Sequence, residues 1–206
     1  MGSAAEGKPR SVGEGGGNTL IRALDVVVSA IALLVCAPVL AIAAIAIRLG
    51  SPGPVLYRQQ RIGKDGVPFE MLKLRTMVPG SDPVGVGTAV TRDDPRVTRP
   101  GRLLRRFSLD EIPNLINVLR GDMSIVGPRP TIEAQVREYT PHQRRRLEVK
   151  PGITGWAQVR GRAGIPWEER IDLDVWYVDH RSFLLDLRIL GRTVWLLVTG
   201  HGLAPE

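Results

Sequence analysis

Residues 26–47 read VVVSAIALLVCAPVLAIAAIAI, a run of 22 residues without a charged side chain. As an α-helix this run would measure about 33 Å, which is enough to cross the hydrocarbon core of a bilayer. It is longer than the apolar part of a secretory signal peptide, which holds about 7 to 15 residues. It is also long for a helix that is buried in a protein core. The sequence therefore predicts a membrane helix over residues 20–50.

Pro38 lies near the middle of this run, where it removes a backbone hydrogen-bond donor and crowds the carbonyl of Leu34. We therefore expect the membrane helix to break or kink at Pro38. Basic residues stand on both sides of the run, with Arg22 before it and Arg48 after it. Basic residues favour the cytoplasmic side of a membrane, so a helix that spans the bilayer would have no clear orientation here. Both basic flanks would satisfy this preference if both ends of the helix stayed on the cytoplasmic side.

The rest of the chain divides into one soluble domain and two tails. Residues 1–19 are small and polar and contain three consecutive glycines, so we expect a disordered tail. The segment Ser51-Pro52-Gly53-Pro54 ends the membrane helix, because proline and glycine do not continue it. A domain over residues 51–200 follows, and residues 201–206 form the second tail.

The first half of this domain shows two strand patterns and a loop pattern. Residues 55–59 and 68–74 are predicted to be short strands. Residues 78–101 are rich in proline, glycine and aspartate, and we expect them to form a long loop. The overall prediction is a small mixed α/β domain.

The second half shows helical patterns. A helix is predicted from apolar residues at helical spacing, and Gly121 is expected to end it. These residues are Leu109, Ile112, Leu115, Ile116 and Leu119. Another helix is predicted to begin after Thr140, with Pro141 at its first position and Gln143 completing a capping box. Residues 183–198 are apolar but interrupted by charges, which is typical of an amphipathic helix that lies on a membrane.

The charge of the chain indicates a phosphorylated partner. The net charge is +7, and only four of the 28 basic residues are lysines. Arginine binds phosphate through paired hydrogen bonds, so nucleic acid, a nucleotide or an anionic lipid would each fit, and a solvated basic surface is the alternative. The run Arg144-Arg145-Arg146 suggests a nucleic-acid binder, but only 5% of the chain is aromatic and available for base stacking. We expect no nucleic-acid partner.

Two adjacent acids, Asp110 and Glu111, follow Arg105 at the predicted start of a helix. Ser108 and Glu111 have the spacing of a capping box, so one interpretation of the acids is purely structural. Pro113 weakens that interpretation, because it would lie beyond the first turn and remove a helical hydrogen bond. In the other interpretation, Arg105 and the helix start keep Asp110 ionised, and an ionised aspartate ligates Mg²⁺ or attacks phosphorus.

Three cations are further candidates for phosphate binding. Lys73 and Arg75 stand two residues apart on a predicted strand, so both would point to one face and suit a diphosphate. Arg129 stands between Pro128 and Pro130, which stiffen the backbone and reduce the entropy lost when the side chain binds a ligand. An exposed strand face and a rigid surface turn are the alternatives.

Several longer motifs in one continuous order are more specific than any single residue. They are Lys73-Leu74-Arg75-Thr76-Met77, Ser108-Leu109-Asp110-Glu111, the segment from Gly121 to Pro130, and Lys150-Pro151-Gly152-Ile153-Thr154-Gly155-Trp156-Ala157-Gln158-Val159-Arg160-Gly161-Arg162. Together they resemble the bacterial sugar transferase family, the monotopic polyprenyl-phosphate phosphoglycosyl transferases. The resemblance covers about residues 20 to 200.

The resemblance implies a re-entrant helix in the cytoplasmic leaflet of the bacterial inner membrane. A small cytosolic α/β catalytic domain with interfacial amphipathic helices would follow it. The family breaks this helix at a Ser-Pro pair, whereas the present chain has Ala37-Pro38, so the serine that helps to satisfy freed backbone groups is missing. Larger relatives carry additional spanning helices before this unit, so the chain resembles the minimal form.

The resemblance also implies the chemistry. Asp110 would attack the sugar-bearing phosphate of a UDP-sugar, release UMP and hold the phosphosugar until undecaprenyl phosphate, a polyprenyl phosphate lipid, takes it. Glu111 matches a partner acid proposed as the base for the acceptor, and Mg²⁺ beside Asp110 would neutralise the diphosphate. Positions expected to bind substrate are Lys73, Arg75, Arg105, Arg129 and Arg162. The product would serve surface glycoconjugate or exopolysaccharide synthesis.

Overall fold

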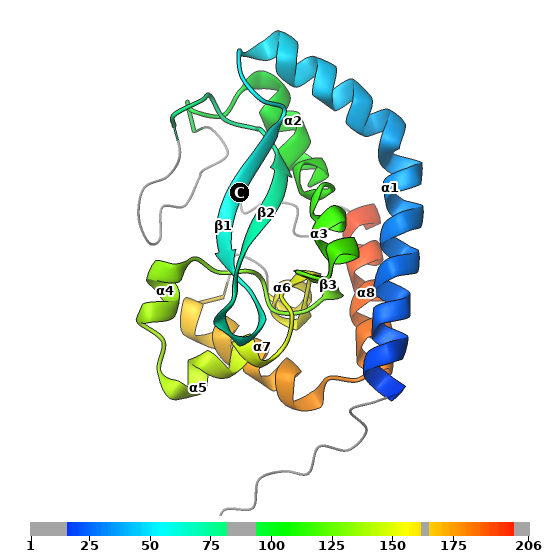
Figure 1. Ribbon diagram of the computed structural model, residues 1–206, viewed down its shortest axis with the longest axis vertical. Coiled ribbons are helices and arrows are strands. Elements are labelled where there is room, and N and C mark those ends of the chain that lie inside the picture. Colours follow the sequence, from blue (N-terminus) through cyan, green and yellow to red (C-terminus); the bar gives the residue numbers. More distant parts are fainter. Residues whose placement is uncertain (1–15, 82–93, 162–164, 200–206) are drawn as a thin grey trace, which may run out of the picture.

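A computed structural model of the chain describes residues 16–81, 94–161 and 165–199 (Figure 1). Its longest element is helix α1, Gly16–Gly50, which lies beside the last helix, α8, Phe183–Thr199. The remaining elements lie to one side of α1 (Figure 1). The structure confirms the predicted mixed α/β class with a long apolar N-terminal helix.

The strands form two small sheets. Strand β1, Leu56–Ile62, pairs antiparallel with β2, Pro68–Leu74, and a short 3₁₀ turn, η1, Lys64–Gly66, connects them. Strand β3, Ser124–Val126, pairs parallel with β4, Gly152–Thr154. The prediction of β2 is confirmed with its bounds, and β1 extends to Ile62 instead of ending at Gln59 because it pairs along the whole length of β2.

The expected loop over residues 78–101 is shorter than predicted. Helix α2, Arg99–Arg106, begins inside it, because Thr98 accepts a hydrogen bond from the backbone N–H of Gly101 and Pro100 stands in the first turn. Met77 and Val97 form an isolated antiparallel bridge. Residues 82–93 lie outside the described part of the chain.

The predicted helix over residues 109–119 is divided in two. Residues Leu109–Glu111 form a 3₁₀ turn, η2, and helix α3, Asn114–Arg120, begins only after Pro113. Proline at that position lacks the N–H that a continuous α-helix would need. Gly121 ends α3 with a φ of 93°, as predicted for a left-handed C-terminal residue.

Short helices complete the domain. The capping box of Thr140 and Gln143 is present and confirms that predicted helix start. The remaining elements are α4, Glu133–Arg137; α5, Pro141–Arg144; η3, Arg145–Glu148; α6, Trp156–Arg160; and α7, Trp167–His180. The main core joins both sheets to the long helices through Met71, Val118, Met123, Tyr177 and Ile189.

α1 begins earlier than expected and passes through its proline. Residues 16–19, expected in the disordered tail, are helical, and Asn18 accepts a hydrogen bond from Arg181 at 3.5 Å, while residues 1–15 lie outside the described part. The helix continues without interruption through Pro38, so Pro38 does not break it, and α1 bends in its second half (Figure 1). A bend is the milder outcome of the lost hydrogen bond.

α1 exposes a large apolar surface. In the described part of the chain it is the one helix long and apolar enough to cross a membrane, and only 11% of this apolar stretch is buried inside the protein. A core helix would be mostly buried. The exposed large apolar side chains of α1 are Leu20, Val26, Val27, Ile31, Leu34, Val35, Val39, Ile42, Ile45 and Leu49.

The N-terminal part of α1 is bound to the domain by polar contacts. Arg22 donates hydrogen bonds to the carbonyls of Val118 and Leu119, at 2.6 and 2.8 Å, and so satisfies the C-terminal end of α3. The buried carboxylate of Asp25 accepts a hydrogen bond from the backbone N–H of Ile125 at 2.8 Å. This end of α1 therefore lies directly against α3 and β3.

The C-terminal end of α1 is bound to the same domain. Arg75, just beyond β2, donates to the carbonyls of Ser51 and Pro52, both at 2.8 Å. Ile47 is buried in a second apolar cluster with Leu74. Both ends of α1 thus contact one domain, which lies on one side of the helix.

Asp186 provides a test of stability against pH. Burial raises the pKa of this carboxyl to about 6, although Tyr177 donates a 2.7 Å hydrogen bond to it, and its Oδ2 has no partner in the described part of the chain. A raised folded-state pKa means that stability is lost as pH rises from about 4 to about 6. We expect Asp186→Asn to stabilise the protein by about 1–3 kcal/mol at pH 7.5 and to leave it unchanged near pH 4. Thermal unfolding at both pH values checks this, and an equal effect at the two would contradict it.

Candidate active site

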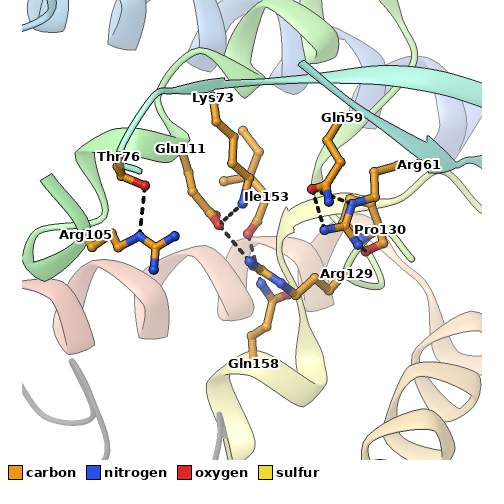
Figure 2. Close-up of polar contacts among 10 residues, drawn as sticks. All are labelled: Gln59, Arg61, Lys73, Thr76, Arg105, Glu111, Arg129, Pro130, Ile153 and Gln158. Atoms are coloured by element: carbon orange, nitrogen blue, oxygen red, sulfur yellow. Dashed lines mark hydrogen bonds and ion pairs between the residues drawn. The ribbon is translucent and has the colours of Figure 1, made fainter. Parts of the chain in front are cut away.

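Glu111 lies at the centre of a group of charged side chains (Figure 2). Its Oε1 accepts hydrogen bonds from Lys73 Nζ at 3.0 Å and from Arg129 Nη2 at 2.7 Å. Lys73 comes from the end of β2, and Arg129 from the segment after β3. The structure therefore brings together three of the predicted site residues from distant parts of the sequence.

The turn that carries the acids is not a capped helix start. Ser108 adopts a left-handed conformation, with a φ of 55°, and its side chain makes no capping hydrogen bond. The Glu111 side chain instead pairs with Lys73 and Arg129. The capping interpretation of Ser108 and Glu111 is wrong, because the left-handed Ser108 and Pro113 confine this segment to a single 3₁₀ turn.

The close packing of β3 against β4 holds the backbone that carries Arg129. A Cβ on Gly127 would lie 2.4 Å from the carbonyl oxygen of Lys150, so only glycine fits there. The backbone N–H of Gly152 then donates to the carbonyl of Pro128 at 2.9 Å. The backbone just before Arg129 is therefore held in place at the end of β3.

Glu111 is a fully ionised carboxylate in the free protein. Its burial alone would raise its pKa, but the charges and hydrogen bonds of Arg129 and Lys73 together lower the pKa well below its usual range. Lys73 shows the opposite balance, because burial lowers its pKa while Glu111 raises it. The carboxylate and its two cations thus stabilise one another's charged forms.

Asp110 is buried beside this cluster, with 8% of its surface exposed. Burial raises the pKa of Asp110, and Glu111 raises it further, whereas Lys73 and Arg105 lower it. Arg105 thus favours the ionised form of Asp110, as expected, while burial acts in the opposite direction and the net shift of the pKa is upward. The 3₁₀ turn is too short to supply a strong helix dipole, and burial outweighs the nearby cations.

Arg105 and Arg61 stand on opposite sides of the cluster (Figure 2). Arg105, from α2, donates to Thr76 Oγ1 at 2.9 Å. Arg61, from β1, is held by Gln59 Oε1 at 2.7 Å and by the carbonyl of Pro130 at 3.3 Å. Burial and the nearby Arg129 lower the pKa of Arg61. Sequence reasoning missed Arg61 as a site residue, because the contact that places it there spans 69 positions.

Arg75 does not reach this cluster. It is buried against the carbonyls that follow α1 and, as β2 ends at Leu74, it does not share a strand face with Lys73. Its function as a diphosphate clamp is a prediction that the geometry disfavours. Arg162 lies outside the described residues.

A buried ion pair also binds the backbone of Arg129. Arg146 donates to Asp174 Oδ2 at 2.5 Å and to the backbone carbonyl of Arg129 at 3.0 Å, and both side chains of the pair are almost fully buried. Tyr139 accepts a further hydrogen bond from Arg146 at 2.6 Å. No sequence pattern indicates this pairing, because Arg146 stands in a run of three arginines of which Arg144 is exposed and Arg145 is half-buried.

The arrangement suits phosphate chemistry. Several cations surround one buried aspartate that lies next to an ionised glutamate, and such cations stabilise the oxygens of a phosphate group. No group of three or more metal-ligating side chains exists among the described residues. Asp110 is the one carboxylate of the pair not engaged by a salt bridge, which fits a Mg²⁺ ion held mainly by substrate phosphates. The fold and the site together would suit an enzyme that acts on phosphorylated substrates beside a long apolar helix.

Known proteins are similar in sequence to this chain over most of its length. The bacterial sugar transferase family matches residues 17–200. The chain is 46% identical to a sugar transferase of unestablished function from Bacillus subtilis over 89% of this chain and 90% of that protein. It is 50% identical to the UDP-glucose:undecaprenyl-phosphate glucose-1-phosphate transferase of Caulobacter vibrioides, over 86% of this chain and 69% of that protein.

A third relative acts on a different sugar. It is the UDP-N-acetylgalactosamine-undecaprenyl-phosphate N-acetylgalactosaminephosphotransferase of Aeromonas hydrophila, 38% identical over 88% of this chain and 44% of that protein. The chain belongs to the bacterial sugar transferase family. It is accordingly an enzyme of the sugar-phosphate transferase class.

Proposed function

We propose that the protein transfers a sugar 1-phosphate from a UDP-sugar to undecaprenyl phosphate, with release of UMP, as a membrane step of surface polysaccharide or glycoconjugate synthesis. The observation that carries the proposal is the buried Asp110 beside the Lys73–Glu111–Arg129 cluster. The names of the relatives supply the substrate classes.

In the first step, a carboxylate oxygen of Asp110 attacks the phosphorus that carries the sugar. The bond from that phosphorus to the bridging oxygen breaks, and UMP leaves with both bonding electrons. Lys73, Arg105 and Arg129 stabilise the charge that builds on the diphosphate oxygens. The charges of Lys73 and Arg105 lower the pKa of Asp110 and so favour its ionised, attacking form.

In the second step, an oxygen of the lipid phosphate attacks the phosphorus of the aspartyl phosphosugar. The bond to Asp110 breaks, the carboxylate is regenerated, and the diphosphate-linked lipid forms. In the free protein Glu111 is a weak base, since Lys73 and Arg129 hold its pKa down. When Lys73 and Arg129 bind substrate phosphate in place of Glu111, the pKa of Glu111 rises. Glu111 is then able to accept a proton from the acceptor.

The direct test of the proposal is UMP release. Purified protein is mixed with a panel of UDP-sugars, with and without undecaprenyl phosphate. We expect one UMP per enzyme without lipid and continuous release with it. No release from any nucleotide sugar would overturn the proposal.

Mg²⁺ is part of the proposal, with Asp110 and the substrate diphosphate as its ligands. The ion would neutralise diphosphate charge when bound. We expect excess EDTA to lower UMP release at least about a hundredfold and added Mg²⁺ to restore it. Undiminished release in EDTA would remove the metal from the mechanism.

The membrane topology is a further part of the proposal. We infer that α1 enters the cytoplasmic leaflet of the inner membrane and returns, because both of its ends are bound to one domain while its outer face is apolar. A spanning helix would place its two ends on opposite sides of the bilayer. The domain would then lie at the cytoplasmic face.

Cysteine labelling tests this topology. Thr19 and Pro54 flank the membrane segment and are exposed, whereas Gly53 is unsuitable because a Cβ there would lie 2.3 Å from Arg75. In a Cys36→Ala background, we expect cysteine at either position to react with an impermeant maleimide only after cells are opened. Labelling of either position in intact cells would exclude the re-entrant helix.

A further inference from the structure

A groove with a cavity volume of about 500 Å³ lies between α6 and α8, among residues that the proposed chemistry does not use. Its lining consists of three arginines and two tryptophans: Trp156, Arg160, Arg188, Arg192 and Trp195. None of the charged residues around Glu111 contributes to it.

The arginines of this groove have no acidic partner in the described part of the chain. Arg188 and Arg192 stand four residues apart on α8, where like charges repel each other. The one acid of α8, Asp186, is buried and bound to Tyr177. Two exposed arginines elsewhere do have acidic partners, since Arg58 pairs with Glu70 and Arg137 with Glu133.

Two of the three guanidinium groups are held in place. Arg160 lies over the ring of Trp156, 4.3 Å from its centroid, and Trp156 stacks in turn on Trp176 at 4.9 Å. Arg192 donates from Nε to the carbonyl of Val159 at 3.1 Å, which leaves its terminal nitrogens for another acceptor. An ordered set of donors without a counter-ion suits a phosphate group.

The groove borders an apolar stripe on the same helix. Leu184, Leu187, Val194 and Val198 are exposed on α8 and follow helical spacing. Arg188 follows Leu187 directly, and Arg192 stands one helical turn after Arg188. Helix α8 lies beside α1, whose outer face is also apolar (Figure 1). Arginine and tryptophan at the edge of an apolar surface are typical of the headgroup level of a bilayer.

We propose that this groove binds the phosphate headgroup of an anionic glycerophospholipid, with its acyl chains along the apolar stripe of α8. The inference rests on the proposed membrane placement of α1, which α8 contacts. It assigns the site to a bilayer lipid instead of the acceptor, because the groove and the Glu111 cluster share no residue. The bound lipid would fix the height of the domain on the membrane.

The test uses the full chain in phosphatidylcholine nanodiscs that contain a tenth phosphatidylglycerol. Retained lipid is identified by native mass spectrometry. We expect the wild type to retain phosphatidylglycerol, and Arg188→Gln/Arg192→Gln to weaken retention about tenfold. Arg58→Gln/Arg137→Gln removes the same charge from paired surface arginines and is expected to bind as the wild type does.

Three results of the retention measurement would overturn the inference. They are wild-type retention by the groove variant, an equal loss in the control variant, and displacement of the lipid by millimolar inorganic phosphate. The KM for undecaprenyl phosphate is also compared in nanodiscs of phosphatidylcholine alone. A higher KM in Arg188→Gln/Arg192→Gln than in the wild type would show that the groove is the acceptor site, and this result too would overturn the inference. UMP release by the wild type is measured in parallel, so loss of the proposed activity with lipid retention intact is recognised as failure of the proposed function alone.

Discussion

Asp110→Asn is expected to abolish both attachment of the phosphosugar to the protein and release of UMP. The substitution removes the attacking oxygen charge at nearly constant shape, and Asp110 is the buried acid that no salt bridge engages. Removal of a nucleophile lowers turnover by at least about 10⁴-fold. Intact-protein mass after mixing with a nucleotide sugar and Mg²⁺, without lipid, measures the adduct directly.

A matched control separates chemistry from folding. Asp172→Asn removes an exposed carboxylate that pairs with His142, and it should form the adduct as the wild type does. Thermal unfolding of Asp110→Asn should show a folded protein, because a neutral amide relieves the cost of burying a charge there. An adduct that persists in Asp110→Asn, or that maps to Glu111, would reverse the two roles.

Glu111→Gln is expected to slow transfer to the lipid by about 10²- to 10³-fold while the adduct still forms. The amide cannot accept a proton from the acceptor, and it no longer compensates the charges of Lys73 and Arg129. Adduct formation should also slow, but less, because Asp110 remains. Single-turnover measurements of adduct mass and of lipid product separate the two steps.

The control for this prediction is Glu133→Gln. Glu133 pairs with Arg137 on an exposed surface, so its loss should change neither step. Abolished adduct formation in Glu111→Gln would mean that Glu111 acts in the first step. Equal slowing of both steps would mean that Glu111 only holds Lys73 and Arg129 in place by its charge.

Local signals explain which parts of the fold the sequence predicts. The strand at Pro68–Leu74, the capping box at Thr140 and the glycine that ends α3 each depend on neighbouring residues. The start of α2 was missed because proline and glycine dominate the composition around it, although Thr98 and Pro100 are helix-start residues.

The candidate site was predicted only in part for a related reason. Lys73, Glu111 and Arg129 were expected from motifs, and the structure brings them together. The contacts of Arg61 and Arg146 join segments that are distant in sequence, so no spacing pattern indicates them. Arg75 was assigned to the wrong face because period-two reasoning fails once a strand has ended.

The attachment of α1 at both ends has a mechanical consequence. A catalytic domain on a single flexible linker changes its distance from the bilayer freely. A domain that is bound to both ends of its membrane helix does not. The hydrogen bonds of Arg22, Asp25 and Arg75 make α1 part of the rigid body of the domain. In a membrane, the depth of Asp110 would then be set by geometry. Acceptors would be selected by where their phosphate lies relative to the leaflet as well as by chemical structure, so a phosphate on a chain too short to partition would be a poor acceptor at any bulk concentration.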